Sequence, residues 1–224
     1  MIAFNARRAF RVAYSEPCEN SPCSVVPAFF YAGTKLATRH GWSTVETLEE
    51  GQRVLTADYQ EIEIISLQED VLELSSCRGL VSDWPVQIPE GILNNTQALL
   101  VSANQRLVLE NPTMRRAREK SLISLRAETL VGYRGIARAP LRSDLPRVVL
   151  GFAQATTLVL DGGLRLDVPG MSGELAVPPL NDRQSRSIVH KMRMELARET
   201  FWFKAQKSAE RKQASSLPPS LEGW

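Results

Sequence analysis

Residues 31–38 of this chain read Tyr31-Ala32-Gly33-Thr34-Lys35-Leu36-Ala37-Thr38, and a related pattern continues to Asp58. Apolar and polar side chains alternate between Thr38 and Thr56 around glycines that mark turns, which is typical of short strands joined by tight connections. The residues that carry the pattern after residue 40 are Gly41, Val45, Glu46, Leu48, Gly51, Val54, Thr56 and Asp58. The stretch therefore predicts the beginning of a β-rich domain.

This stretch resembles the opening block of the Hint domain, the hedgehog/intein self-processing module, in its bacterial form. That block reads roughly C-F-x-x-G-T-x-I-x-T and then G-x-x-x-V-E-x-L-x-x-G-D-x-V-x-T-x-D, and the glycines, threonines, Val-Glu pair and final aspartate are in register here. The resemblance implies a mainly β, horseshoe-shaped fold of long bent antiparallel strands. It also places the family's nucleophilic cysteine at Phe29, whose side chain has no lone pair with which to attack a carbonyl carbon.

A second block carries a change of the same kind. The apolar run 98–101 leads into Ser102-Ala103-Asn104-Gln105-Arg106-Leu107-Val108-Leu109, which is similar to the family's S/T-x-x-H-R-V-L. Gln105 stands where the resemblance places a histidine that shuttles protons. Glutamine donates hydrogen bonds but does not titrate near neutral pH. The resemblance thus implies a degenerate member without catalytic residues, altered at Phe29 and Gln105.

Other nucleophiles leave one alternative open. Cys23 lies eleven residues before Thr34 instead of five, which displaces it by roughly 20 Å in an extended chain. The nearby hydroxyl groups belong to Ser24, Tyr31 and Thr34. An autoprocessing domain that cleaves or ligates through one of these atypical nucleophiles is therefore the alternative to a non-catalytic module.

Composition favours a single β domain with an extension. The chain has 224 residues, a formal net charge of +2 and 7% aromatic residues, which does not favour a nucleic-acid-binding surface. Cys18 and Cys23 are separated by four residues and no second pair of Cys or His follows, so we expect no metal site. The sequence also indicates no cofactor and no small-molecule ligand.

The chain divides into three predicted regions. Residues 1–27 suggest an irregular arm, residues 28–170 the β domain, and residues 171–224 a linker, a helix and a loose tail. Arg7-Arg8 is not followed by the apolar segment of an export signal, and charged residues interrupt every apolar stretch. We therefore expect a cytoplasmic protein. The other predicted elements are strands within 61–67, 70–74, 99–109, 148–153 and 157–160 and a short helix within 121–131.

The predicted terminal helix runs from about residue 183 to residue 214, without proline or glycine. Ile188, Met192 and Leu196 recur at helical spacing. Such a stripe packs on the β domain, binds a partner or lies on a membrane surface. The candidate interaction residues are Phe201, Trp202, Phe203 and Trp224.

These features together predict a non-catalytic Hint-like binding or assembly module. The expected partner is a protein, or a larger complex of which this chain is a subunit. A peripheral membrane adaptor that binds lipid through the C-terminal helix is the second alternative, after self-processing.

Overall fold

The computed structural model describes residues 28–77, 81–111, 121–161 and 163–216, and beyond residue 200 it describes only the helical backbone. The predicted arm, with Cys18, Cys23 and Ser24, and the predicted contact residue Trp224 lie outside these residues. The strands and helices, including three 3-10 helices (η), follow in chain order: β1 Phe29–Tyr31, β2 Lys35–Thr38, β3 Gly41–Thr44, η1 Val45–Thr47, β4 Arg53–Leu55, β5 Glu61–Leu72, α1 Leu74–Cys77, η2 Val81–Asp83, β6 Val86–Ile88, β7 Leu99–Val101, β8 Arg106–Glu110, β9 Leu122–Arg126, η4 Ala127–Leu130, β10 Ala137–Arg138, β11 Leu145–Phe152, β12 Thr156–Val159, β13 Arg165–Val168 and α2 Asp182–Ser216.

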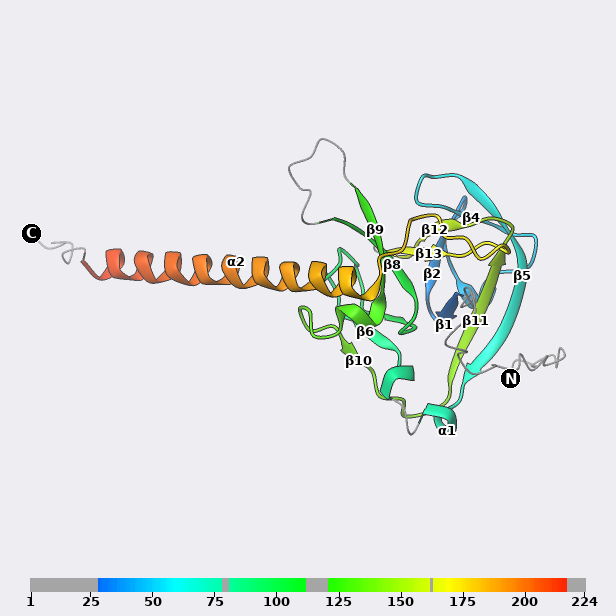
Figure 1. The fold of residues 1–224 in the computed structure, drawn as a ribbon, viewed down its shortest axis with the longest axis horizontal. Helices are drawn as coiled ribbons and strands as arrows, with labels where there is room; N and C mark the ends of the chain where they lie inside the picture. Colours follow the sequence, from blue (N-terminus) through cyan, green and yellow to red (C-terminus); the bar gives the residue numbers. More distant parts are fainter. Residues whose placement is uncertain (1–27, 78–80, 112–120, 162, 217–224) are drawn as a thin grey trace, which may run out of the picture.

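The fold is mainly β, as the sequence predicted. A seven-stranded sheet has the order β10-β6-β7-β1-β11-β5-β4, and a four-stranded sheet has the order β12-β13-β8-β9. All ladders between named strands are antiparallel, and β2 pairs with β3. β5 and β11 form a long curved pair along one side of the domain (Figure 1). This pair matches the long bent strands that the resemblance implied.

Apolar side chains from both sheets meet in one main core. Phe30 of β1, Ile64 of β5 and Phe152 of β11 are almost completely buried there, together with Leu107 and Leu166 of the smaller sheet. Tyr31, Leu72 and Cys77 form a second, smaller cluster. Phe30 and Tyr31 are adjacent and belong to different clusters because successive side chains of a strand point to opposite faces. Strand β1 is therefore buried on both faces.

Three predicted elements differ from the structure. Residues 61–74 contain one strand, β5, instead of two, and residues 99–109 contain two, β7 and β8, separated by a turn. The short helix predicted within 121–131 is wrong for its first half, because β9 pairs with β8 along its whole length. Only η4 is helical there, and it is a 3-10 helix. Pairing with the preceding strand overrode the local helical pattern.

Helix α2 begins with a reciprocal cap. The N–H of Gln184 donates to Asn181 Oδ1 at 2.9 Å, and the N–H of Asn181 donates to Gln184 Oε1 at 3.0 Å. This pair satisfies the backbone group that would otherwise be unpaired at the helix start. The expected helix is confirmed, with bounds Asp182–Ser216.

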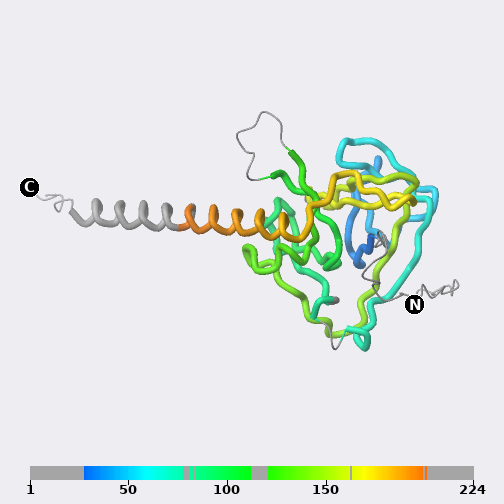
Figure 2. Tube along the Cα trace, viewed as in Figure 1, coloured from blue at the N-terminus to red at the C-terminus, as the bar shows by residue number. Residues whose placement is uncertain are grey.

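The apolar stripe of α2 packs on the chain's own β domain. Val189 is buried in the main core, and Ile188, Met192 and Leu196 pack against that core. The rest of the helix extends away from the domain (Figure 1), and the coloured part of the tube in Figure 2 shows the same course for the first half of the helix. The side chains of Phe201, Trp202 and Phe203 lie outside the described residues. Most described side chains of α2 remain exposed.

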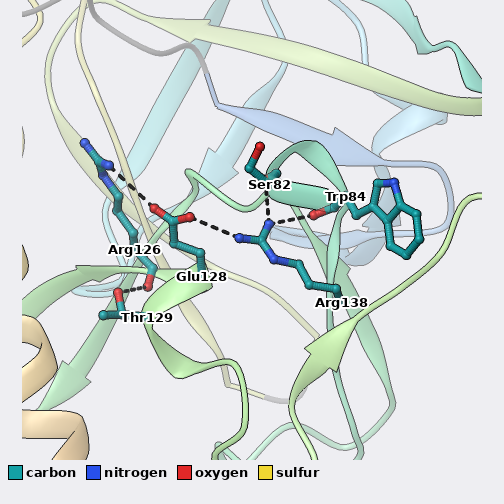
Figure 3. Close-up of polar contacts among 6 residues, drawn as sticks. All are labelled: Ser82, Trp84, Arg126, Glu128, Thr129 and Arg138. Carbon is teal, nitrogen blue, oxygen red and sulfur yellow. Dashed lines mark hydrogen bonds and ion pairs between the residues drawn. The ribbon is translucent and has the colours of Figure 1, made fainter. Parts of the chain in front are cut away.

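A half-buried arginine, Arg138, holds the 3-10 helix η4, which α2 contacts. Arg138 Nη1 donates to the carbonyl oxygens of Ser82 at 2.6 Å and Trp84 at 2.9 Å, and Arg138 Nη2 binds Glu128 Oε2 at 3.0 Å (Figure 3). Arg126 approaches the other Glu128 oxygen at 3.5 Å but is more exposed. Helix η4 contacts α2. Arg138 thus joins η2, β10 and η4 at the base of α2.

We predict that Arg138→Met lowers the free energy of unfolding by about 2 kcal/mol, because it leaves Glu128 and two carbonyl oxygens without their donor. Arg126→Met is the matched control, and it should cost less than about 0.5 kcal/mol because the pair that it removes is longer and solvated. Urea denaturation of both variants measures the difference. Equal losses for the two variants would contradict this account.

Candidate functional site

The position that the resemblance assigns to the nucleophile lies inside the larger sheet. Strand β1 pairs with β11 on one side, where Phe29 is opposite Val149, and with β7 on the other, where Phe30 is opposite Val101. Ala28 and Phe29 are both buried. The peptide bond that a processing relative would attack, between residues 28 and 29, is therefore enclosed by neighbouring strands.

An arginine covers the ring of Phe29. The guanidinium carbon of Arg147, in β11, lies 4.0 Å from the centre of this ring. Arg147 is held by Asp70 of β5, because its Nε and Nη2 atoms donate to Asp70 Oδ2 at 2.8 and 2.7 Å. A cation over an aromatic face and a charge-assisted pair of this geometry both stabilise the arrangement. Where the family has a nucleophile, this chain has a stacked and clamped aromatic ring.

Cross-strand register brings Tyr31 into the same cluster. Tyr31 is opposite Arg147, and Arg147 is opposite Asp70. Burial raises the pKa of Tyr31 to about 12, and the positive charge of Arg147 only partly opposes this increase. The phenol is therefore protonated at neutral pH and is a weak nucleophile. This protonation state weighs against Tyr31 as an atypical nucleophile.

Gln105 ends the turn that follows β7. Its N–H donates to the carbonyl of Ser102 at 2.9 Å, and its side chain is buried. Helix η4 holds this turn from the other side, since Ala127 N–H donates to the Gln105 carbonyl at 2.8 Å and Glu128 N–H to the Ala103 carbonyl at 3.0 Å. Because β7 pairs with β1, the turn lies at the end of a strand adjacent to Phe29. The two altered positions therefore belong to neighbouring segments.

The other candidate side chains do not add a reactive group to this cluster. His40 and His190 are exposed, in a turn after β2 and on α2. Thr34 is buried, and its N–H donates to the Tyr31 carbonyl at 3.0 Å in the turn between β1 and β2. Among the described residues, no three His, Cys, Asp or Glu side chains gather closely enough to hold a metal ion. The described helices also include none long and apolar enough to cross a membrane.

Sequence reasoning missed Arg147 and Asp70. Seventy-seven positions separate the two residues, and only the pairing of β5 with β11 brings them together. No local pattern around either residue marks it as the partner of Phe29. The replacement of cysteine by phenylalanine was the one available signal, because a buried aromatic ring needs a surface on which to pack.

The raised pKa of Tyr31 makes stability depend on pH in the alkaline range. Its folded-state pKa of about 12 exceeds the unfolded value of about 10, so its contribution is complete below pH 10 and is lost as the pH rises toward 12. We predict that the free energy of unfolding falls across this window by about 3 kcal/mol more in the natural chain than in Tyr31→Phe.

Urea midpoints measured between pH 9 and pH 12 test this prediction. Tyr59→Phe is the matched control because it removes an exposed tyrosine and leaves Tyr31 in place, so it should keep the slope of the natural chain. A Tyr31→Phe variant with that same slope would show that the Tyr31 phenol does not cause it.

Several solved structures are similar to part of this chain. Solved structures that are similar include a bacterial intein-like domain from Clostridium thermocellum, with 9% identity, a TM-score of 0.42 and coverage of 62% of this chain and 98% of that domain. The MchDnaB-1 intein (13% identity, TM-score 0.39) covers 62% of this chain and 98% of its own. The AceL NrdHF class 3 split intein, in a splice-inactive variant (13%, 0.40), covers 65% and 99%. No curated protein matches the chain in sequence.

The family pattern described as "Hint domain" matches residues 28–162. The match begins at the buried residue before β1 and includes Phe29, the turn at Gln105 and the long pair of β5 and β11. The predicted domain limit at residue 170 stays a prediction. Because the match spans more than half of the 224 residues, this chain belongs to the Hint domain family.

Proposed function

We propose that this protein is a non-catalytic Hint module that binds a protein partner, as a subunit of a larger assembly. The observation that carries the proposal is the ring of Phe29, buried in the sheet beneath Arg147 at the position where processing relatives need a nucleophile. Acyl transfer from the backbone requires a thiol or hydroxyl group, an activating base and stabilisation of the oxyanion. Phe29 and Gln105 provide neither the nucleophile nor the titrating group.

The packing around Phe29 supports the same reading. The ion pair of Arg147 with Asp70 would have to reorganise before a substrate carbonyl could occupy the space over residue 29. Removing one partner of such a pair leaves a largely buried charge, which is costly. The cluster is therefore built for a stable packed state and not for a reaction cycle.

Helix α2 supports the binding part of the proposal. Its 35 residues correspond to a length of about 50 Å, and only its first turns pack on the domain. Isolated helical segments of moderate length are marginal in water unless a face is buried. A partner that covers the extending part, including Phe201, Trp202 and Phe203, would stabilise it.

Intact mass after incubation tests the catalytic part. The full-length chain, kept with excess thiol or hydroxylamine, should remain a single species of 25.0 kDa, because no side chain at position 29 can form a thioester. Fragments whose masses meet between Ala28 and Phe29 would contradict the proposal and favour an autoprocessing domain.

The double variant Phe29→Cys, Gln105→His serves as the comparison in this experiment. It returns to the scaffold the two residue types that the family uses. Cleavage in the double variant alone would locate the loss of chemistry in these two side chains. Cleavage of the natural chain at any site that depends on thiol would assign the reaction to another nucleophile.

Replacement of the three aromatic residues of α2 tests the proposal that the protein binds a partner. We predict that Phe201→Ser, Trp202→Ser and Phe203→Ser together weaken recovery of a defined partner by at least about tenfold, because aromatic residues contribute most at interfaces. The partner is first identified by cross-linking to the natural chain. His190→Ser, an exposed change on the same helix, is the control and should leave recovery unchanged.

The same variants distinguish a membrane adaptor. The extending helix carries Lys204, Lys207, Arg211 and Lys212 close to the aromatic residues, a composition that also suits anionic lipid. Co-sedimentation with vesicles of phosphatidylserine and phosphatidylcholine, lost in the aromatic variant and present without any protein partner, would replace the protein-binding proposal.

A further inference from the structure

A groove lies apart from the Phe29 cluster, between the two sheets. It has a volume of about 450 Å³ and is lined by the β4–β5 connection, by the start of β12 and by the segment before α2. Its lining includes Asp58, Glu61, Leu122, Ala155, Arg165 and Val177. This volume is within the range of binding sites for small ligands and short peptide segments. Phe29 and Gln105 do not line this groove.

Arg165 is the positively charged residue that lines the groove. It is half-buried in β13, opposite Val159 of β12 and Val108 of β8. Among the residues that the structure describes, Arg165 has no hydrogen-bond or ion-pair partner. A guanidinium group that has lost part of its hydration without gaining a partner favours an anion that restores those hydrogen bonds.

The carboxylates that line the groove are already engaged. Asp58 accepts a hydrogen bond from the hydroxyl of Thr56. Glu61 pairs with Arg53 at 3.5 Å and Arg39 at 4.0 Å. Among the described residues neither carboxylate pairs with Arg165, so this guanidinium group is the lining donor that a ligand carboxylate can bind.

One wall of the groove is fixed by a buried aspartate. Asp167, two residues after Arg165 on the same face of β13, accepts hydrogen bonds from the N–H groups of Ala176 at 3.1 Å and Val177 at 3.4 Å. Gly170 approaches the lining residue Ala155 so closely that a Cβ atom on Gly170 would lie 2.5 Å from the backbone nitrogen of Ala155. These contacts hold two of the lining segments in place without a ligand, which lowers the cost of binding.

The rim provides apolar contacts. Leu122, at the start of β9, lines the groove and is 40% exposed, and Ile62 lines it from β5. Aliphatic side chains beside a polar centre suit the binding of a peptide whose apolar side chains alternate with polar ones.

We propose that this groove binds an extended peptide segment of a partner protein, with an acidic side chain on Arg165 and an apolar neighbour against Leu122. A carboxylate matches the planar donor group of arginine with two parallel hydrogen bonds. The inference rests on the proposed protein-binding function and adds the chemistry of the partner. It places the contact on the β domain, separate from the aromatic residues of α2.

Peptide titration of the isotope-labelled full-length chain tests the proposal. The probes are the blocked peptides acetyl-Gly-Val-Glu-Leu-Gly-amide and acetyl-Gly-Val-Gln-Leu-Gly-amide, followed through the backbone amide chemical shifts of Ala155, Arg165 and Val177. We expect saturable shifts at these amides and about tenfold tighter binding of the glutamate peptide.

Variants show whether Arg165 causes this preference. Arg165→Gln should abolish the difference between the two peptides, and Arg165→Lys should retain part of it, because lysine keeps the charge without the planar donor group. Arg142→Gln, an exposed change in the turn before β11, makes the same change in charge and should leave the difference intact. A preference that survives in Arg165→Gln would overturn the proposal.

Two further results would also overturn it. Equal binding of the two peptides, or no shift at the three amides, would mean that the groove does not select an acidic segment. Inorganic phosphate that shifts these amides as strongly as the glutamate peptide would make the site one for simple anions. These outcomes leave the result of the intact-mass experiment unchanged, so the groove and the non-catalytic function can fail separately.

Discussion

The stacking of Arg147 on Phe29 links strands at the centre of the larger sheet to one another. Asp70 of β5 orients Arg147 of β11, and Arg147 in turn covers the ring of Phe29 in β1. Three strands that are distant in sequence are thus joined by one guanidinium group. Because this group binds a carboxylate and packs on a ring at the same time, loss of Asp70 would leave a largely buried guanidinium group without its ion-pair partner. The position where the family places its reactive residue has become part of the packing.

A continuous set of contacts leads from this cluster to the C-terminal helix. The turn that ends at Gln105 follows β7, which pairs with β1, and its carbonyl groups accept hydrogen bonds from η4. Arg138 binds Glu128 of η4, and α2 packs beside it. These contacts hold the turn at Gln105, where the family resemblance places a histidine. They also orient α2 relative to the β domain, so that a partner would meet a helix in a defined position.

The sequence predicted the parts of the fold that depend on local signals. Turn glycines and alternating residues between Thr38 and Thr56 indicated short strands, and the proline-free stretch after residue 182 indicated a long helix. The structure places the cap of this helix at Asn181. The helix expected within 121–131 was wrong because β9 gains its stability from β8. The function of the module and the roles of Phe201, Trp202, Phe203 and Trp224 stay predictions.

By itself, the sequence determined that this chain has the Hint pattern and that residues 29 and 105 carry phenylalanine and glutamine, because residue type and spacing are written along the chain. Only the tertiary structure decided what surrounds them. The pair of Asp70 and Arg147 depends on the register between two long strands. The position of Arg165 in a groove depends on how segments that are distant in sequence meet around it. Neither has a local signature, since strand pairing brings together residues whose separation in sequence carries no information about their contact.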